Sequence, residues 1–435
     1  MAMREMKESG VDWIAHIPTD WTTNKMKYLF SNGKGLSITK ENLIETGLPV
    51  ISYGQIHSKD NSGTNIKDTL LRYVDFQYQA NNPQCEVFQH DFVFADTSED
   101  YDGCGNCVYK RDTSLLFGGY HAIIMHSLIK HDNRFFAYLF KTDAWRKQLR
   151  EVASGVKVFS ITQKALMNCS IIIPPENEQK EISDFLDAKC SELDTAVSDI
   201  QSQIEALEEY KRSVITEVVT KGLDPDVEMR DSGIAWVGDI PAHWLVEKVK
   251  FHLQRNEPRN PGDKQVLSVY REYGVIPKDS RDDNHNVTSE DTSNYKYVVP
   301  GNLVINKMKA WQGSMGVSEY EGIVSPAYFI YKFTDNQIMP KYLHYLFRSC
   351  YKDEFRRISG GIREGQWDLS PYEFSNTLLL IPPTDEQNRI VSYIDARISE
   401  IEFAITEKKQ QIETIEEYKK SLIFEYVTGK KEVQA

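Results

Sequence analysis

Apolar residues recur every seven positions in two long stretches of this chain. The first stretch has two such rows, four residues apart: Leu186, Leu193, Ile200, Leu207 and Val214, then Cys190, Val197, Ile204 and Val218. The second stretch repeats them, with Lys408 as the one break: Ile394, Ile401, Ile415 and Leu422, flanked by Ile398, Ile405 and Ile412. A seven-residue apolar repeat is typical of helices that pack in a coiled coil. The pattern therefore predicts two long, related helices.

Each predicted helix begins at a Pro-Pro pair, at Pro174-Pro175 and at Pro382-Pro383. Proline suits the first turn of a helix, and the acidic residues that follow favour the positive end of its dipole. A helix of about 40 residues is roughly 60 Å long at ~1.5 Å per residue, which is too long for an ordinary core helix. The helices could join two chains as a dimer. Their position after two globular segments of similar size favours pairing within one chain, which makes a spacer.

The parts of the chain occur twice in the same order. Shifting the first helix by 208 residues places Leu207-Glu208-Glu209-Tyr210-Lys211 on Ile415-Glu416-Glu417-Tyr418-Lys419. A second repeat, offset by 223 residues, relates Trp13, Ile17-Pro18 and Trp21 to Trp236, Ile240-Pro241 and Trp244. We expect these tryptophans to anchor a turn to a core rather than to form a ligand cage. The predicted order is globule, helix, globule, helix, with boundaries at 1–175, 176–222, 223–383 and 384–435.

Both globular segments are predicted to be mixed α/β. Strand-like runs bounded by turn residues occur at 86–88, 92–94, 297–299 and 303–305. One helical stretch follows in each half, from Phe135 to Ala153 and from Pro340 to Ile358. The fold class is therefore α/β (α+β), with a pseudo-repeat of two globular domains and two long helices.

Charge is divided unevenly among these parts. The whole chain carries −13, of which residues 176–231 carry −10 and residues 384–435 carry −3. The globular segments 1–175 and 232–383 are neutral. An acidic helix pair would be repelled by phosphates. If nucleic acid is the ligand, the globular segments hold it.

The cysteines and the apolar runs of the chain indicate its cellular compartment. The six cysteines show no framework spacing, and we expect free thiols in a reducing compartment. The chain has no run of 18 apolar residues, and its N-terminus lacks the apolar core of a signal peptide. A cytoplasmic location without a membrane partner is the expectation.

The repeated Trp-x3-Ile-Pro-x2-Trp and Ile-Pro-Pro-x2-Glu-Gln motifs, the Glu-Glu-Tyr-Lys-x-Ser helix ends and the order of parts resemble the specificity subunit of type I restriction-modification enzymes. The resemblance covers the whole chain. It implies two target-recognition domains that each read one half of a split site in double-stranded DNA. It also implies that the two helices pack antiparallel as a coiled coil that fixes the gap between the halves.

The resemblance further implies a non-catalytic chain without a cofactor of its own. Its partners would be two modification subunits, which methylate adenine with S-adenosylmethionine, and restriction subunits, which cleave and translocate DNA with ATP and Mg.

Candidate catalytic motifs are incomplete, in agreement with that expectation. The sequence contains no Walker phosphate loop. Ser325-Pro326-Ala327-Tyr328 approaches the [DNS]-Pro-Pro-[YF] loop of amino-methyltransferases but lacks its second proline. Residues 225–230 resemble a nuclease cluster only faintly, with arginine in place of lysine. Cys104 and Cys107 form half of a zinc knuckle.

Reading DNA requires base-edge donors and acceptors, cations for phosphates, and loops that can enter a groove. In the second half the best candidate segment is 306–314, after a predicted strand. It offers Lys307 and Lys309 for phosphates, Gln312 for adenine and Trp311 for packing. The segment 360–367, with Arg363 and Gln366, is the second choice. Tyr270 and Arg271 could contribute. An ordinary polar surface remains an alternative for all of them.

In the first half, residues 154–160 correspond to 360–367, which makes Lys157 and Ser160 candidates. Tyr53 and Gln55 occupy a place similar to Tyr270 and Arg271. Residues 96–101 match 306–311 but are acidic where the second half is basic. Carboxylates can accept from cytosine N4, so this segment could also read bases.

The main functional prediction is therefore a DNA sequence-specificity subunit that recognises a bipartite, asymmetric site and directs methylation or restriction by partner subunits. One alternative is a scaffold in which two modules on a coiled coil hold proteins. Another is an independent methyltransferase.

Overall fold

The computed structural model describes residues 4–128, 131–155, 157–271, 273–280, 288, 291–361 and 367–433. Its contacts divide the chain into two compact units. Unit 1 comprises residues 1–200 and 410–435, and unit 2 comprises residues 201–409. Each unit therefore holds one globular domain together with one end of each long helix.

The two predicted long helices are present. Helix α6 spans Glu176–Lys221 and helix α10 spans Thr384–Val427. At ~1.5 Å per residue, a helix of 46 residues is about 69 Å long. The structure ends α10 at Val427, so residues 428–433 of the predicted range 384–435 are not helical. A turn through Gly429, whose φ is +69°, follows instead.

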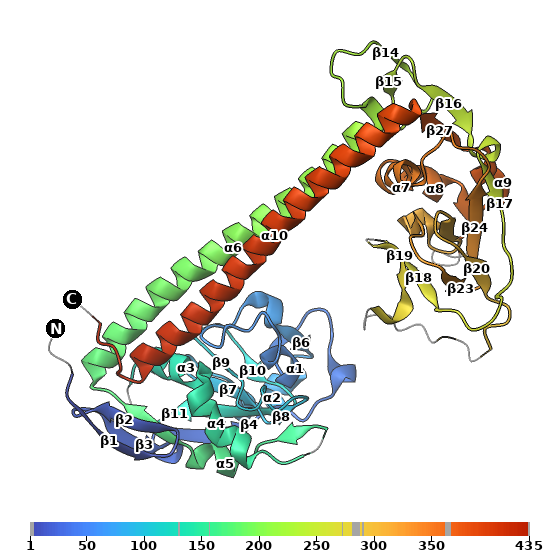
Figure 1. The fold of residues 1–435 in the computed structure, drawn as a ribbon. Helices are drawn as coiled ribbons and strands as arrows, with labels where there is room; N and C mark the ends of the chain where they lie inside the picture. Colours follow the sequence, from blue (N-terminus) through green and yellow to red (C-terminus); the bar gives the residue numbers. More distant parts are fainter. Residues whose placement is uncertain are drawn as a thin grey trace. The chain divides into compact units, whose positions relative to one another are not determined.

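The helices pair antiparallel within each unit (Figure 1). In unit 1 the rings of Phe185 and Tyr426 lie 4.4 Å apart. In unit 2 the Lys211 ammonium lies 3.8 Å from Glu402, and Lys408 donates to Gln203 over 2.5 Å. Residue numbers rise along one helix as they fall along the other. The Lys408 bond also explains the break in the heptad pattern, because this lysine reaches a polar partner on α6.

Unit 1 is built on a four-stranded antiparallel sheet in the order β4-β11-β7-β9. Its strands are β4 (Phe30–Lys34), β11 (Ala122–Ser127), β7 (Phe92–Ala95) and β9 (Cys107–Tyr109). A second sheet, β10-β5-β6, contains β10 (Phe117–Gly118), β5 (Leu48–Ile51) and β6 (Arg72–Val74). Three two-stranded pairs join β1 (Met6–Val11) to β2 (Ile14–Pro18), β3 (Thr22–Lys25) to β13 (Ser170–Ile173), and β8 (Thr97–Ser98) to β12 (Phe159–Ser160). The short helices are α1 (Tyr53–Ile56), α2 (Gln77–Asn81), α3 (Asn133–Lys141), α4 (Asp143–Val152) and α5 (Gln163–Asn168).

Unit 2 repeats this framework with the sheet order β17-β24-β21-β22. These strands are β17 (Leu253–Arg255), β24 (Tyr328–Phe333), β21 (Leu303–Asn306) and β22 (Met315–Val317). The two-stranded pairs are β14 (Met229–Asp231) with β15 (Asp239–Pro241), β16 (Leu245–Lys248) with β27 (Leu378–Ile381), β18 (Leu267–Tyr270) with β19 (Gly274–Pro277), β20 (Lys296–Val298) with β23 (Gly322–Val324), and β25 (Ser359–Gly360) with β26 (Asp368–Leu369). The short helices are α7 (Pro340–Ser349), α8 (Lys352–Arg357) and α9 (Pro371–Asn376).

Two expectations about local structure were wrong. The run 86–88 is not a strand, because Phe88 N donates to the Asp91 carboxylate over 2.7 Å and turns the chain. The single helical stretch expected from Phe135 to Ala153 is two helices, since the side chain of Thr142 caps a new helix by accepting from Trp145 N. The stretch from Pro340 to Ile358 also divides into two helices, α7 and α8, here without a side-chain cap at the start of the second.

The core of each unit includes the helix ends. In unit 1, Trp21, Phe135 and Trp145 are fully buried with Leu186 of α6 and Val427 of α10. In unit 2, Trp244 is buried in the core that contains Val219 of α6 and Ile394 of α10. Trp21 and Trp244 are thus core residues, as predicted.

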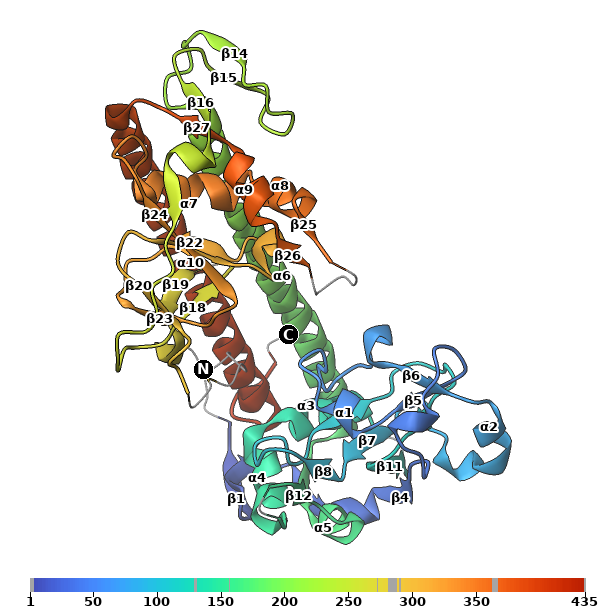
Figure 2. The same ribbon diagram turned by 90° about the vertical axis from the view of Figure 1, so that its right-hand side faces the viewer.

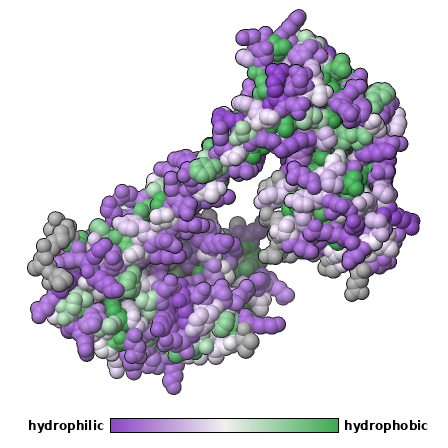
Figure 3. Space-filling view, in the orientation of Figure 1, coloured by the Kyte–Doolittle hydropathy of each residue, from purple (hydrophilic) through white to green (hydrophobic). Residues whose placement is uncertain are grey.

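The surface shown in Figure 3 is mostly hydrophilic, with small separate hydrophobic patches. No helix in the described ranges is both long and apolar enough to cross a membrane. The six cysteines are free thiols, as predicted.

Candidate nucleic-acid interface

The predicted reading loop of unit 2 connects β21 to β22. The Asn306 side chain accepts from Met308 N over 3.1 Å and starts the turn. Gly313 ends it with φ +85°, a conformation that suits glycine. Ala310 is buried beneath the loop, while Lys309 is exposed and Trp311 and Gln312 are half-buried. The loop therefore presents polar and aromatic side chains on a fixed backbone.

The structure brings a second predicted segment to this loop. Arg271 donates to Gln312 Oε1 over 2.5 Å. Arg348 connects the end of β18 to the start of β22. It donates to the Arg271 carbonyl and, over 3.3 Å, to the Met315 carbonyl. Arg271 and Gln312, which lie 41 residues apart, thus form one donor and acceptor pair. Tyr270, the neighbouring candidate, is half-buried.

The third predicted segment also flanks the loop. Lys307 makes an ion pair of 2.9 Å with Asp368, and the rings of Trp311 and Trp367 lie 5.6 Å apart. The guanidinium of Arg356 lies 6.0 Å from the Trp311 ring. Arg363 and Gln366 fall within 362–366, outside the described residues. The described residues thus bring together candidates from two parts of the sequence, with Trp367 and Asp368 beside them.

Unit 1 has the same backbone connection with the opposite charge. Ile161 N donates to the Asp96 carbonyl over 2.8 Å, and Leu369 N donates to the Lys307 carbonyl over 2.9 Å. Asp96 is therefore the counterpart of Lys307. The alignment of Asp96 with Asn306 was wrong by one residue, because β7 ends at Ala95 where β21 ends at Asn306. Figure 2 shows β8 beside β12 and β25 beside β26 at these connections.

Polar and aromatic side chains gather around Asp96. His121 Nδ1 lies 3.0 Å from the Asp96 carboxylate, and Thr97 Oγ1 donates to the same carboxylate over 2.7 Å. The rings of Tyr53 and His121 lie 5.5 Å apart. His121 has φ +54°, a conformation that is rare for a residue with a side chain and that concentrates at functional sites. His121 was not among the residues predicted to read DNA, because a positive φ leaves no apolar or polar pattern in the sequence.

The other unit 1 candidates differ in whether their side chains are exposed or bonded within the fold. Gln55 Oε1 accepts from Ser52 N over 3.2 Å and caps α1. Ser160 pairs with Thr97 across β12 and β8, and its side chain is exposed. Lys157 is exposed next to this pair. Lys157 and Ser160 thus border the Asp96 cluster, whereas Gln55 has a local structural role.

A hollow of about 520 Å³ opens beside the Asp96 cluster. Asp96, Tyr120 and His121 form one side of it, and Lys34 and Lys164 lie at its rim. Lysine ammonium groups beside polar side chains are suited to contact phosphates. Lys34 and Lys164 are 130 residues apart and line one hollow only through the fold, so the sequence did not predict them.

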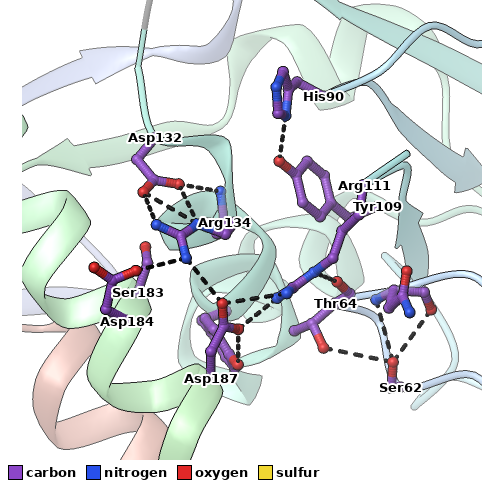
Figure 4. Close-up of polar contacts among 12 residues, drawn as sticks. Ser62, Thr64, His90, Tyr109, Arg111, Asp132, Arg134, Ser183, Asp184 and Asp187 are labelled. Atoms are coloured by element: carbon purple, nitrogen blue, oxygen red, sulfur yellow. Dashed lines mark hydrogen bonds and ion pairs between the residues drawn. The ribbon is translucent and has the colours of Figure 1, made fainter. Parts of the chain in front are cut away.

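Each globular domain is connected to a long helix by a half-buried aspartate of that helix. In unit 1 the Asp187 carboxylate accepts from Tyr138 over 2.7 Å, from Arg134 over 3.0 Å and from Arg111 (Figure 4). Burial opposes the ionisation of Asp187, but these hydrogen bonds outweigh it and hold its pKa below the ordinary value. In unit 2 the Asp395 carboxylate accepts from the Tyr345 hydroxyl over 2.5 Å and from the Lys341 ammonium over 2.7 Å. Both anchors orient a domain on a helix.

The repeated sequence motifs make a second connection of the same kind. Trp21 donates to Glu178 over 2.8 Å, and Trp244 donates to Glu386 over 3.1 Å. The next residue in each motif, Gln179 or Gln387, is fully buried. Its side chain donates to the carbonyl of Pro174 or Pro382 and accepts from the backbone N–H at the start of α3 or α7. The motifs therefore have a structural role at the start of each long helix.

Cys104 and Cys107, the half zinc knuckle, are buried. Burial raises the pKa of the Cys107 thiol to about 12, and it also raises the pKa of Cys104. Zinc binds thiolates, so this environment opposes a role as ligands. In the part of the chain that the structure describes, no three His, Cys, Asp or Glu residues form a group that could hold a metal.

Comparison with known proteins decides the family. The model of the type I restriction modification DNA specificity domain matches residues 18–206 and 252–414, which cover both repeats. The chain belongs to this family. The predicted family and the predicted fold class are thus confirmed.

Full-length relatives of this specificity family agree. A protein of Methanocaldococcus jannaschii, provisionally named the type I restriction enzyme MjaX specificity subunit, is 22% identical over 96% of this chain and 95% of its own length. The type I restriction enzyme EcoKI specificity subunit of Escherichia coli K12 is 20% identical over 87% of this chain and 82% of its own length. A solved chain of a type I R-M system has a TM-score of 0.66 at 14% identity and covers 95% of this chain and 99% of that one. That similarity shows the fold.

Proposed function

We propose that this chain is the subunit of a type I restriction-modification complex that selects the DNA sequence. The domain at 1–175 reads one half of a bipartite, asymmetric site in double-stranded DNA, and the domain at 223–383 reads the other. The chain does no chemistry itself. Two modification subunits methylate adenine and restriction subunits cleave, using S-adenosylmethionine, ATP and Mg.

The observation that carries this proposal is a common framework with different reading side chains. The family match covers both repeats. At equivalent backbone positions, unit 1 has Asp96 beside His121 and unit 2 has Lys307 near the Arg271–Gln312 pair. Carboxylates accept from cytosine N4, whereas arginine and glutamine prefer guanine and adenine edges. Two halves with different chemistry suit an asymmetric site.

The antiparallel helix pair supports a fixed gap between the two half-sequences. Its contacts run from Phe185–Tyr426 in unit 1 to Gln203–Lys408 in unit 2, on two unbroken helices. A helix pair is stiff compared with a flexible linker.

The test is selection of bound sequences from a random duplex library by this chain assembled with modification subunits. Gln312→Ala should relax the preference in one half of the selected site, and Asp96→Asn should relax it in the other half. Lys40→Ala, an exposed lysine of the first domain, is the control. Equal binding of all duplexes would refute the proposal and favour a protein scaffold. If one substitution relaxed the base preference in both halves of the site, the claim that each domain reads one half would be refuted.

A further inference from the structure

Unit 1 contains a second cavity, separate from the hollow beside Asp96. Its volume is about 770 Å³, which is in the range of small-molecule sites. Its walls are residues 56–63, the turn 102–107, the junction of α3 and α4, and residues 420–424 of α10. Asn61 fixes the first wall by donating to the carbonyls of Ile56 over 2.7 Å and Cys107 over 3.0 Å. The cavity is thus a preformed part of the fold.

Positive charge dominates its lining. Lys141, Arg146, Arg150 and Lys420 face it, together with Asp102 and Asp143. Arg150 makes an ion pair of 2.8 Å with Asp143. Arg146 donates to two backbone carbonyls, those of Cys104 and Asp102. Lys141 and Lys420 have no ion pair or hydrogen bond among the described residues, so the cavity keeps uncompensated cations.

Lys141 lies at the end of α3 with its stem against Gly63. A Cβ atom at Gly63 would lie 3.8 Å from Lys141 Cδ. Burial, together with the nearby charges of Lys419 and Lys420, lowers the pKa of Lys141 to about 8, although Cys190 and Asp194 act in the opposite direction. Burial and Arg150 also lower the pKa of Arg146. Both charged forms would be stabilised by an anion in the cavity.

We propose that this cavity binds a phosphate group. Arginine forks and lysine ammonium groups are the side chains that bind phosphate most strongly. Hydroxyl groups of Ser58 and Ser421 line the same space as further donors, and Phe140 supplies an apolar wall. The phosphate belongs either to a free nucleotide or to the DNA backbone. The site does not depend on base reading, so it can be tested apart from the proposed function.

The first experiment measures amine acetylation in the full-length chain at pH 8, with each lysine quantified by peptide mass spectrometry. The acetylation rate of Lys141, divided by its exposed fraction, should be higher than the same ratio for Lys40 in the first domain. Pyrophosphate, ATP and a 30-base-pair duplex are then added separately. Protection of Lys141 but not Lys40 by pyrophosphate or ATP assigns the site to free phosphates. Selective protection by the duplex alone assigns it to the DNA backbone. Absence of selective protection by all three overturns the proposal.

The second experiment separates binding from folding. Lys141→Met and Lys420→Met should each weaken binding of the protecting compound at least about ten-fold in titration calorimetry, whereas Lys40→Met should not. Because Lys141 is a half-buried cation without an anion, Lys141→Met should leave Tm unchanged or raise it. Unchanged affinity in both variants would overturn the proposal. Altered sequence preference in library selection is a separate readout and would bear on the proposed function alone.

Discussion

The Asp187 anchor gives a quantitative prediction for unit 1. Asp187→Asn keeps the size of the side chain but removes the charge that pairs with Arg111 and Arg134. An exposed ion pair contributes about 0–1 kcal/mol, and loss of one partner of a fully buried pair costs about 3–5 kcal/mol. The Asp187 side chain is 22% exposed and also accepts from Tyr138. We therefore expect a loss of about 2–3 kcal/mol in the free energy of unfolding.

The assay is thermal and denaturant unfolding of the full chain. For a domain of 150–250 residues, a loss of about 2–3 kcal/mol lowers Tm by about 4–12 °C. Asp184→Asn is the matched control. Its side chain is 55% exposed and pairs with Arg134 alone, so it should change Tm by less than about 4 °C.

The pH dependence adds a second criterion. The pKa of Asp187 is lower in the folded chain than its ordinary value of 3.8, so its contribution is fully present above that value. It is lost as the pH falls below about 4, and the difference between wild type and Asp187→Asn should shrink there. An equal Tm at pH 7, or a difference as large at pH 3 as at pH 7, would refute the assigned role.

Three further predictions concern DNA binding. Lys307→Ala should weaken binding to all duplexes and reduce the slope of log affinity against log salt by about 1. The control Lys332→Ala on β24 should change neither quantity. An unchanged slope in Lys307→Ala would argue against a phosphate contact. His121→Gly should relieve the positive φ and raise stability by up to about 1 kcal/mol while altering the preference in one half-site, as measured by unfolding and library selection. Deleting the facing heptads 203–209 and 402–408 shortens the helix pair by about 10 Å, or about three base pairs of DNA. The mapped gap between the half-sequences should therefore shorten while both half-sequences persist. An unchanged gap would contradict the role of the helix pair as a spacer.

The helices were predictable because their heptads recur from Leu186 to Val218 and from Ile394 to Leu422. Even Lys408, the break in the pattern, became explicable only through Gln203 on the facing helix. Breaks in the shorter helical stretches were harder to recognise. Thr142 followed by Asp143 is a helix start, but the apolar residues on both sides continue the helical pattern. Local capping outweighed periodicity there.

The candidate site was predictable only in part, for a physical reason. A loop after a strand is visible in sequence, which is how 306–314 was selected. The meeting of Arg271 with Gln312, or of Lys34 with Lys164, depends on loops that the fold brings together. The positive φ of His121 depends on its backbone surroundings. Such features carry no periodic signal, so sequence reasoning identified single loops but not the clusters.

The central claim is that two domains on one chain read two different half-sequences at a fixed distance. It is tested most directly by mapping N6-methyladenine across a genome in cells that express this chain with modification subunits. The account predicts one bipartite motif, with two unlike half-sequences and a constant gap, that disappears when this chain is omitted. A single continuous motif, a palindrome, or methylation that persists without this chain would contradict it.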